Sequence, residues 1–198
     1  MGDKRGMDKG NYKIKLYTSQ SDIVLQIIEN EGVSYSKKEF VRKKYLESAP
    51  IFITAYSWFV EEAKKIIPKP EKAEYPYWAF KELYNLDDSV YGNVLELNVP
   101  LEEVILFDLF DWNKIICMKY IGVSEKDEME FKETIKKFGL KETDIMLTNF
   151  YPELKQSIIE SWKRLFRNHE NIKNGNEEGI GGVQAGLWQI KKEWIKKY

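Results

Sequence analysis

The sequence predicts an α+β fold, a single domain with a mixed or antiparallel sheet and several helices. Segments with strand-type alternation and segments with helix-type spacing follow one another, but not in a regular βαβ series. The chain also contains no internal repeat, low-complexity tract or clear linker. We therefore expect one domain over residues 11–198. We expect residues 1–10, which are rich in Gly and Lys, to be a disordered or tag-like N-terminus.

The first half of the chain predicts two strands and three helices. Ile14, Leu16 and Thr18 alternate with neighbours of the opposite kind, which indicates a strand with one face in the core. Serines at 19 and 21 can cap the following helix, and Gly32 fits the position just past its end. The predicted elements are a strand at 14–18, a helix from about 20 to 31, a basic helical segment at 36–48, a helix at 51–67 and a strand at 75–80. Pro50 is expected to separate the second helix from the third.

The second half predicts further strands, three helices and one loop. A capping pair at Ser124 and Asp127 favours a helix that ends before Gly139, and Pro152 opens another helix. Residues 168–182 are rich in Asn, Gly and Glu and are expected to form a flexible loop. The remaining predicted elements are strands at 94–99, at 104–107 and from 183 onward, and a helix from 108 to about 120.

Composition limits the classes of partner. The 31 basic residues are balanced by 32 acidic ones, so the net charge of −1 argues against bulk attraction to nucleic acid. The basic segment 37–44 is either a solvated helix face or a local phosphate contact. No apolar run reaches 18 residues, so no membrane span is expected. The single cysteine, Cys117, is expected to be buried and fits a cytoplasmic location.

No strong catalytic signature is present. His169 is the only histidine, so no metal site is expected, and its position after a long helix predicts a solvated side chain. Asp108 and Asp111 are either helix caps or a carboxylate pair. Trp58 and Trp162 lie on apolar helix stripes and are expected in the core. Trp78, Trp112 and Trp188 either pack in the core or line a pocket.

Several motifs occur in an order that resembles a bacterial and phage domain family of unknown function. They are Leu16-Tyr17-Thr18-x-Gln20, Tyr56-x-Trp58, Tyr75-Pro76-x-Trp78-Ala79, Val99-Pro100, Phe107-Asp108, Trp112-Asn113 and Gln184-Ala185-x-x-Trp188. The resemblance covers most of residues 14–198. It implies no activity by itself.

The arrangement is also similar, more distantly, to the ADP-ribosyltransferase fold of DNA-modifying toxins. That likeness implies a first strand that anchors a nicotinamide riboside and a last strand that carries a catalytic glutamate, often just after Gln-Ala. It places Tyr17, Thr18 and Gln20 at the first position and Gln184 to Gln189 at the last, with NAD as the cofactor. Here Gly186 follows Gln184-Ala185, so the glutamate is not at its usual place.

Three functional hypotheses follow. The first is a nucleotide-dependent transferase of the toxin or phage-conflict type, with an unknown protein or nucleic-acid acceptor. The second is a non-catalytic binding or interaction module on the same fold. The third is a regulatory partner that uses segment 37–44. The first and second share one set of expected ligand-binding residues, which we also expect to lie close together: Tyr17, Thr18, Gln20, Trp78, Gln184 and Trp188.

Overall fold

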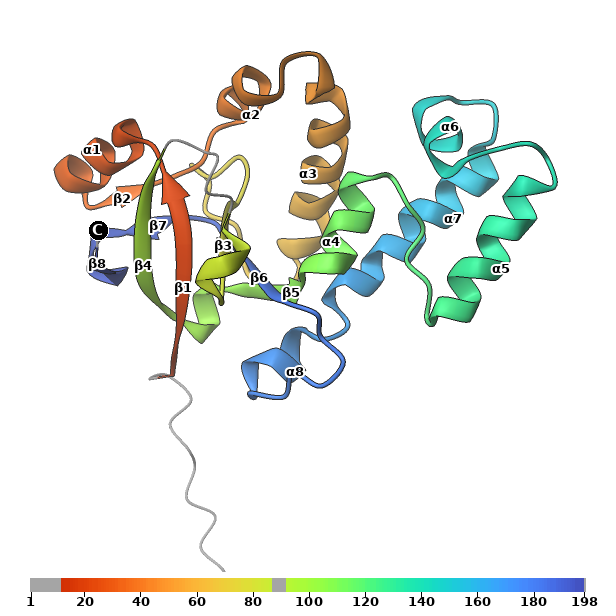
Figure 1. Ribbon diagram of the computed structural model, residues 1–198. Coiled ribbons are helices and arrows are strands. Elements are labelled where there is room, and N and C mark those ends of the chain that lie inside the picture. Colours follow the sequence, from red (N-terminus) through yellow and green to blue (C-terminus); the bar gives the residue numbers. More distant parts are fainter. Residues whose placement is uncertain (1–11, 87–91, 198) are drawn as a thin grey trace, which may run out of the picture.

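The computed structural model describes residues 12–86 and 92–197 and confirms an α+β fold (Figure 1). The expectation for residues 1–10 lies outside the described residues. Within the described part, one antiparallel sheet has the strand order β5-β6-β3-β1-β4-β8, and β2 pairs separately with β7. The strands are β1 (Lys13–Gln20), β2 (Val33–Ser34), β3 (Tyr77–Phe80), β4 (Asn93–Pro100), β5 (Ile105–Asp108), β6 (Val183–Leu187), β7 (Ile190–Lys191) and β8 (Ile195–Lys197).

The helices flank this sheet, and α5, α6 and α7 extend to one side beyond α3 and α4 (Figure 1). The α-helices are α1 (Asp22–Glu31), α2 (Lys38–Tyr45), α3 (Ala49–Ala63), α4 (Leu109–Ile116), α5 (Glu125–Lys136), α6 (Glu142–Leu147), α7 (Pro152–Trp162) and α8 (His169–Lys173). Short 3-10 turns are η2 (Leu46–Ser48), η3 (Leu83–Asn85), η4 (Leu101–Glu103), η5 (Lys163–Phe166) and η6 (Lys192–Trp194). Among the described helices, none combines the length and apolarity needed to cross a membrane.

The first and last predicted strands lie close together, as expected, with β3 between them. Tyr17 of β1 pairs with Phe80 of β3, and Phe80 pairs with Gln184 of β6. Because paired residues in a sheet point to the same face, these three side chains share one side of the sheet. The sequence motifs at 16–20, 75–79 and 184–188 therefore meet on neighbouring strands.

Each face of the sheet buries its own apolar core. On β5, Ile105 and Phe107 join the core formed with α3, α4 and α7, whereas Leu106 joins the core formed with α1 and α8. This division follows from strand geometry, since successive side chains point to opposite faces.

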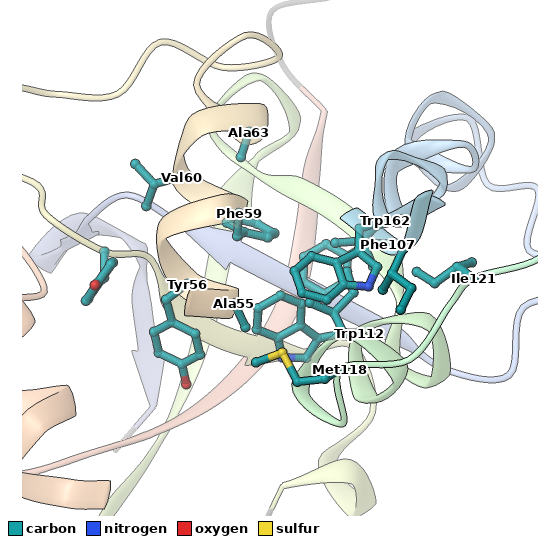
Figure 2. Packing of buried hydrophobic residues seen from close by; sticks show 14 of the residues in the cluster. Ala55, Tyr56, Phe59, Val60, Ala63, Phe107, Trp112, Met118, Ile121 and Trp162 are labelled. Atoms are coloured by element: carbon teal, nitrogen blue, oxygen red, sulfur yellow. The ribbon is translucent and has the colours of Figure 1, made fainter. Parts of the chain in front are cut away.

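Phe59 is the centre of the first core. Its fully buried ring lies 5.0 Å from the Trp78 ring and 5.5 Å from the rings of Phe107 and Trp112, between centroids. Figure 2 shows Phe59 on α3 facing Phe107 and Trp112. A Cβ atom at Gly186 would lie only 2.8 Å from Phe59 Cζ. Glycine at 186 thus lets α3 pack directly on β6.

Four expectations are corrected by the structure. Pro50 does not separate two helices but lies in the first turn of α3, where its missing N–H costs no helical bond. Cys117 is exposed, because it ends α4 on the solvent side while Met118 turns inward. The first part of 168–182 is helical, as α8. His169 begins that helix and is only 5% exposed, with Leu106 N donating to its Nδ1 at 3.1 Å.

Trp162 should contribute much more to stability than Trp58. Trp162 is fully buried and donates from Nε1 to Lys119 O at 2.7 Å, whereas Trp58 is half-buried and packs on the Trp162 ring. We expect Trp162→Ala to lower the free energy of unfolding by about 3–5 kcal/mol, and Trp58→Ala by clearly less. Urea denaturation measures both, and equal losses would contradict the assigned packing.

The buried His169 should make stability depend on pH. Burial lowers the pKa of His169, as does nearby Lys173, while Glu170 acts in the opposite direction. The unfolded chain therefore binds the proton more readily, so stability is complete above about pH 6.5 and falls as the pH drops below it. His169→Gln retains an acceptor for Leu106 N but cannot titrate. The variant should show a shallower loss of unfolding free energy just below about pH 6.5, and parallel curves would contradict this assignment.

Candidate functional site

A cavity of about 420 Å³ lies where the end of β1 meets the start of β3, below α2 and beside α1 and α3. Its volume is within the range typical of small-molecule sites. The side chains that line it are uncharged and are either aromatic, small and polar, or aliphatic. They are Ser19, Gln20, Ser21, Val24, Ser36, Phe40, Val41, Tyr45, Tyr56, Tyr77, Trp78, Phe80 and Asn85.

The cavity forms at the point where the pairing of β1 with β3 stops. β1 pairs with β4 along its whole length, but its register with β3 is recorded only at Tyr17 and Phe80. Past that pair, the Thr18 hydroxyl donates to Trp78 O at 2.7 Å and thus satisfies a carbonyl that a strand ladder would otherwise occupy. Gln20 Nε2 donates to the same hydroxyl at 2.7 Å. Side chains therefore hold the two strands where the ladder stops.

Aromatic rings form the inner wall. The Tyr56 ring lies edge-on to Trp78, with centroids 5.1 Å apart, and the Tyr45 ring stacks on Phe52 at 3.5 Å. The hydroxyls of Tyr45 and Tyr56 are 3.4 Å apart. These contacts connect α2 to α3 and α3 to β3.

Tyr56 stays protonated at neutral pH. Burial, followed by the neighbouring Tyr45, raises the pKa of the Tyr56 phenol well above its ordinary value, and the nearby Trp78 indole only partly opposes this rise. The Trp78 Nε1–H nevertheless does not reach normal hydrogen-bond geometry with Tyr56 or with any other described acceptor. Trp78 is thus close to a hydroxyl but is not bonded to it.

Three buried polar atoms in the cavity lining lack hydrogen-bond partners among the described residues. They are Ser19 Oγ, Trp78 Nε1 and Asn85 Nδ2. Buried polar atoms are nearly always paired, because an unpaired one costs about 1–3 kcal/mol. Their presence together makes this cavity the candidate site.

Only some of the six predicted site residues lie at the cavity. Gln20 and Trp78 line the cavity, and Thr18 is buried beside it as the link between them. Tyr17 precedes the cavity on β1, under the Lys15 ammonium at 5.3 Å. Two residues on or after β6 are not in the lining, namely Gln184, which is buried opposite Phe80, and Trp188, whose Nε1 donates to Ile67 O at 3.0 Å.

Sequence reasoning missed the two partnerless groups Ser19 and Asn85, and it also missed Tyr56 as a wall of the cavity. Ser19 was considered only as a cap, although neither Ser19 nor Ser21 makes a side-chain cap bond to α1. The sequence does not reveal that neither serine caps the helix, because the missing cap bonds are visible only in the structure. Asn85 is the last residue of a short turn, η3, that no periodicity marks.

The acidic pair at the start of α4 is structural. Asp108 caps the helix by accepting from Phe110 N at 2.7 Å, and it also accepts from Gly181 N at 3.0 Å. Asp111 is buried against Arg167, with Nη2 and Oδ2 2.9 Å apart. Burial raises the pKa of the Asp111 carboxyl, and Arg167 and Lys114 oppose the rise. These carboxylates thus fix α4 to its neighbours.

Another hollow, of about 600 Å³, lies beside β2 and β7. Two of its lysines are engaged by glutamates, Lys191 with Glu103 at 2.6 Å and Lys192 with Glu29 at 2.5 Å. This hollow does not contain any of the partnerless buried atoms. Within residues 12–86 and 92–197, no group of three or more His, Cys, Asp or Glu side chains could hold a metal ion.

Comparison with curated proteins gives no match, and comparison with solved structures gives none either. The family comparison is informative, and it confirms the resemblance to a domain family without an assigned function. The model described as "Domain of unknown function (DUF3841)" matches residues 15–196, nearly the whole chain, and the protein therefore belongs to that family.

Proposed function

We propose that this protein is a nucleotide-binding module whose cavity at the end of β1 and β3 receives the flat ring of its ligand. NAD is a candidate through its nicotinamide ring. The proposal rests mainly on one observation, the meeting of three partnerless buried polar atoms inside an aromatic-walled cavity. The toxin or phage-conflict context remains part of the proposal and derives from the resemblance of the sequence motifs.

The lining suits a ring better than a phosphate. Phe40, Tyr45 and Tyr56 offer apolar surface, and the polar groups around them are neutral. A phosphate buried among neutral groups would lose its hydration without gaining a cation, whereas an uncharged base ring loses little. The phosphates of a nucleotide would therefore extend out of the cavity toward solvent.

Binding is favoured over ADP-ribosyl transfer. Transfer by the mechanism that the distant resemblance implies uses a carboxylate close after Gln184-Ala185, where it stabilises developing positive charge. The chain has Gly186 there, and a side chain at that position would collide with Phe59. The packing of α3 on β6 therefore opposes a glutamate at this place.

Trp78→Phe tests the proposal, because it keeps an aromatic ring but removes the partnerless N–H. A panel of NAD, nicotinamide mononucleotide and the common nucleoside monophosphates is titrated by calorimetry. We expect at least one of them to bind the parent protein, and Trp78→Phe to weaken that binding roughly threefold to tenfold, which corresponds to one hydrogen bond. Trp58→Phe is the matched control, since Trp58 lies on α3 outside the cavity lining.

The control should bind like the parent protein, and both variants should melt cooperatively. No binding by any member of the panel to the folded parent protein would contradict the proposal. Equal weakening in Trp78→Phe and Trp58→Phe would also contradict it, because the effect would then come from the core rather than from the cavity.

A further inference from the structure

The unpaired polar groups in the cavity lining are mainly hydrogen-bond donors, and this restricts the kind of ring that can bind there. From this we infer that the ring that the cavity binds is uncharged and carries oxo groups, as in uracil, thymine or hypoxanthine, rather than ring amino groups. The inference rests on the proposed function and names the class of ring within it. That class excludes both rings of NAD, since its nicotinamide is a cation and its adenine carries an amino group.

The donor inventory is asymmetric. The Trp78 indole N–H can only donate, and so can the Asn85 Nδ2 group, whereas the Ser19 hydroxyl can donate or accept. Gln20 has already committed its Nε2 to Thr18 Oγ1. A ligand that satisfies the cavity must therefore bring at least two acceptors to Trp78 and Asn85.

Two lysines near the cavity, Lys81 and Lys37, do not favour an anionic ligand. Lys81, directly after Phe80, pairs with Glu177, and Lys37 donates to Lys72 O at 2.9 Å and lies 3.5 Å from Glu74. Both ammonium groups are thus engaged outside the lining. An anionic ring would remain uncompensated in the cavity, so the ring is neutral.

An oxo group and an amino group of similar size make opposite demands on this lining. A carbonyl oxygen accepts a hydrogen bond from Trp78 Nε1 or Asn85 Nδ2. An amino group in the same place points its own N–H at these donors, so neither donor gains an acceptor. Leaving a buried donor unpaired costs more than the hydrogen bond itself gains. The cavity should consequently distinguish two rings in which an oxo group replaces an amino group.

Two matched ligand pairs test the inference. Uridine and cytidine differ at the 4-position, and inosine and adenosine differ at the 6-position, in each case oxo against amino. The adjacent ring nitrogen changes with it, from an N–H donor in the oxo member to an acceptor in the amino member. We expect the oxo member of at least one pair to bind the parent protein about tenfold more tightly than the amino member. Calorimetry with the free nucleosides measures this without a contribution from phosphate.

Asn85→Asp reverses the polarity of one group with little change in shape. The variant should lose the oxo preference, by a tenfold or greater relative change, and favour the amino member. Asn113→Asp is the matched control, because Asn113 is exposed on α4 and outside the cavity lining. It should keep the preference of the parent protein.

The possible results distinguish a failure of the oxo-ring inference from a failure of the proposed nucleotide binding. Equal affinities within both pairs, or tighter binding of cytidine or adenosine, would overturn the oxo-ring inference and leave nucleotide binding intact. If the parent protein binds none of the nucleosides and none of the nucleotides of the earlier panel, the proposed function fails and the inference fails with it. The comparison of ligand pairs on the parent protein decides the inference even if Asn85→Asp does not fold.

Discussion

The contact of Phe59 with the backbone at Gly186 determines much of this structure. Because position 186 has no side chain, the Phe59 ring can lie against β6, and α3 approaches the sheet closely enough for Trp78, Phe107 and Trp112 to pack around it. The same helix presents Tyr56 one turn earlier, at the wall of the cavity. The close approach that stabilises the core thus also positions the candidate site.

The cavity depends on an interruption of the sheet. β1 is fully paired on its β4 side, so it stays in place even where its pairing with β3 stops. The Thr18 hydroxyl donates a hydrogen bond to the Trp78 carbonyl in place of a β1 backbone N–H. The space beyond this bond is covered by α2. The end of β1 is thus held to β3 by side-chain hydrogen bonds instead of continuous backbone pairing. This arrangement leaves room for a small ring, and it leaves hydrogen-bond donors around that space unpaired.

Much of the fold could be predicted from local patterns, because alternation and helical spacing report burial directly. Leu16 and Thr18 indicated β1, and Trp162 indicated the core side of α7. His169 was misplaced because its burial depends on partners distant in sequence, whereas Cys117 is exposed because it ends α4 on the solvent side. His169 is buried because Leu106, 63 positions earlier, donates to it.

The candidate site shows the same limit. Gln20 could be selected through the distant resemblance, and Trp78 because aromatic side chains are typical of ligand pockets. Ser19 and Asn85 could not, since an unpaired buried atom is a property of the folded environment and not of the residue type. In the sequence, Gly186 was notable only because it stands where the distant resemblance expects a glutamate. The structure supplies the reason, which is the position of Phe59.

The indole N–H resonance of Trp78 tests the central claim most directly. In ¹H–¹⁵N spectra, addition of a nucleoside should shift this resonance, because Nε1 gains an acceptor. The indoles of Trp162 and Trp188 already donate to carbonyls and should stay in place. Trp194 also has a partnerless Nε1 but lies in the opposite core, so its resonance should not move. A bound nucleoside that leaves Trp78 unshifted, or shifts Trp194 equally, would contradict the account.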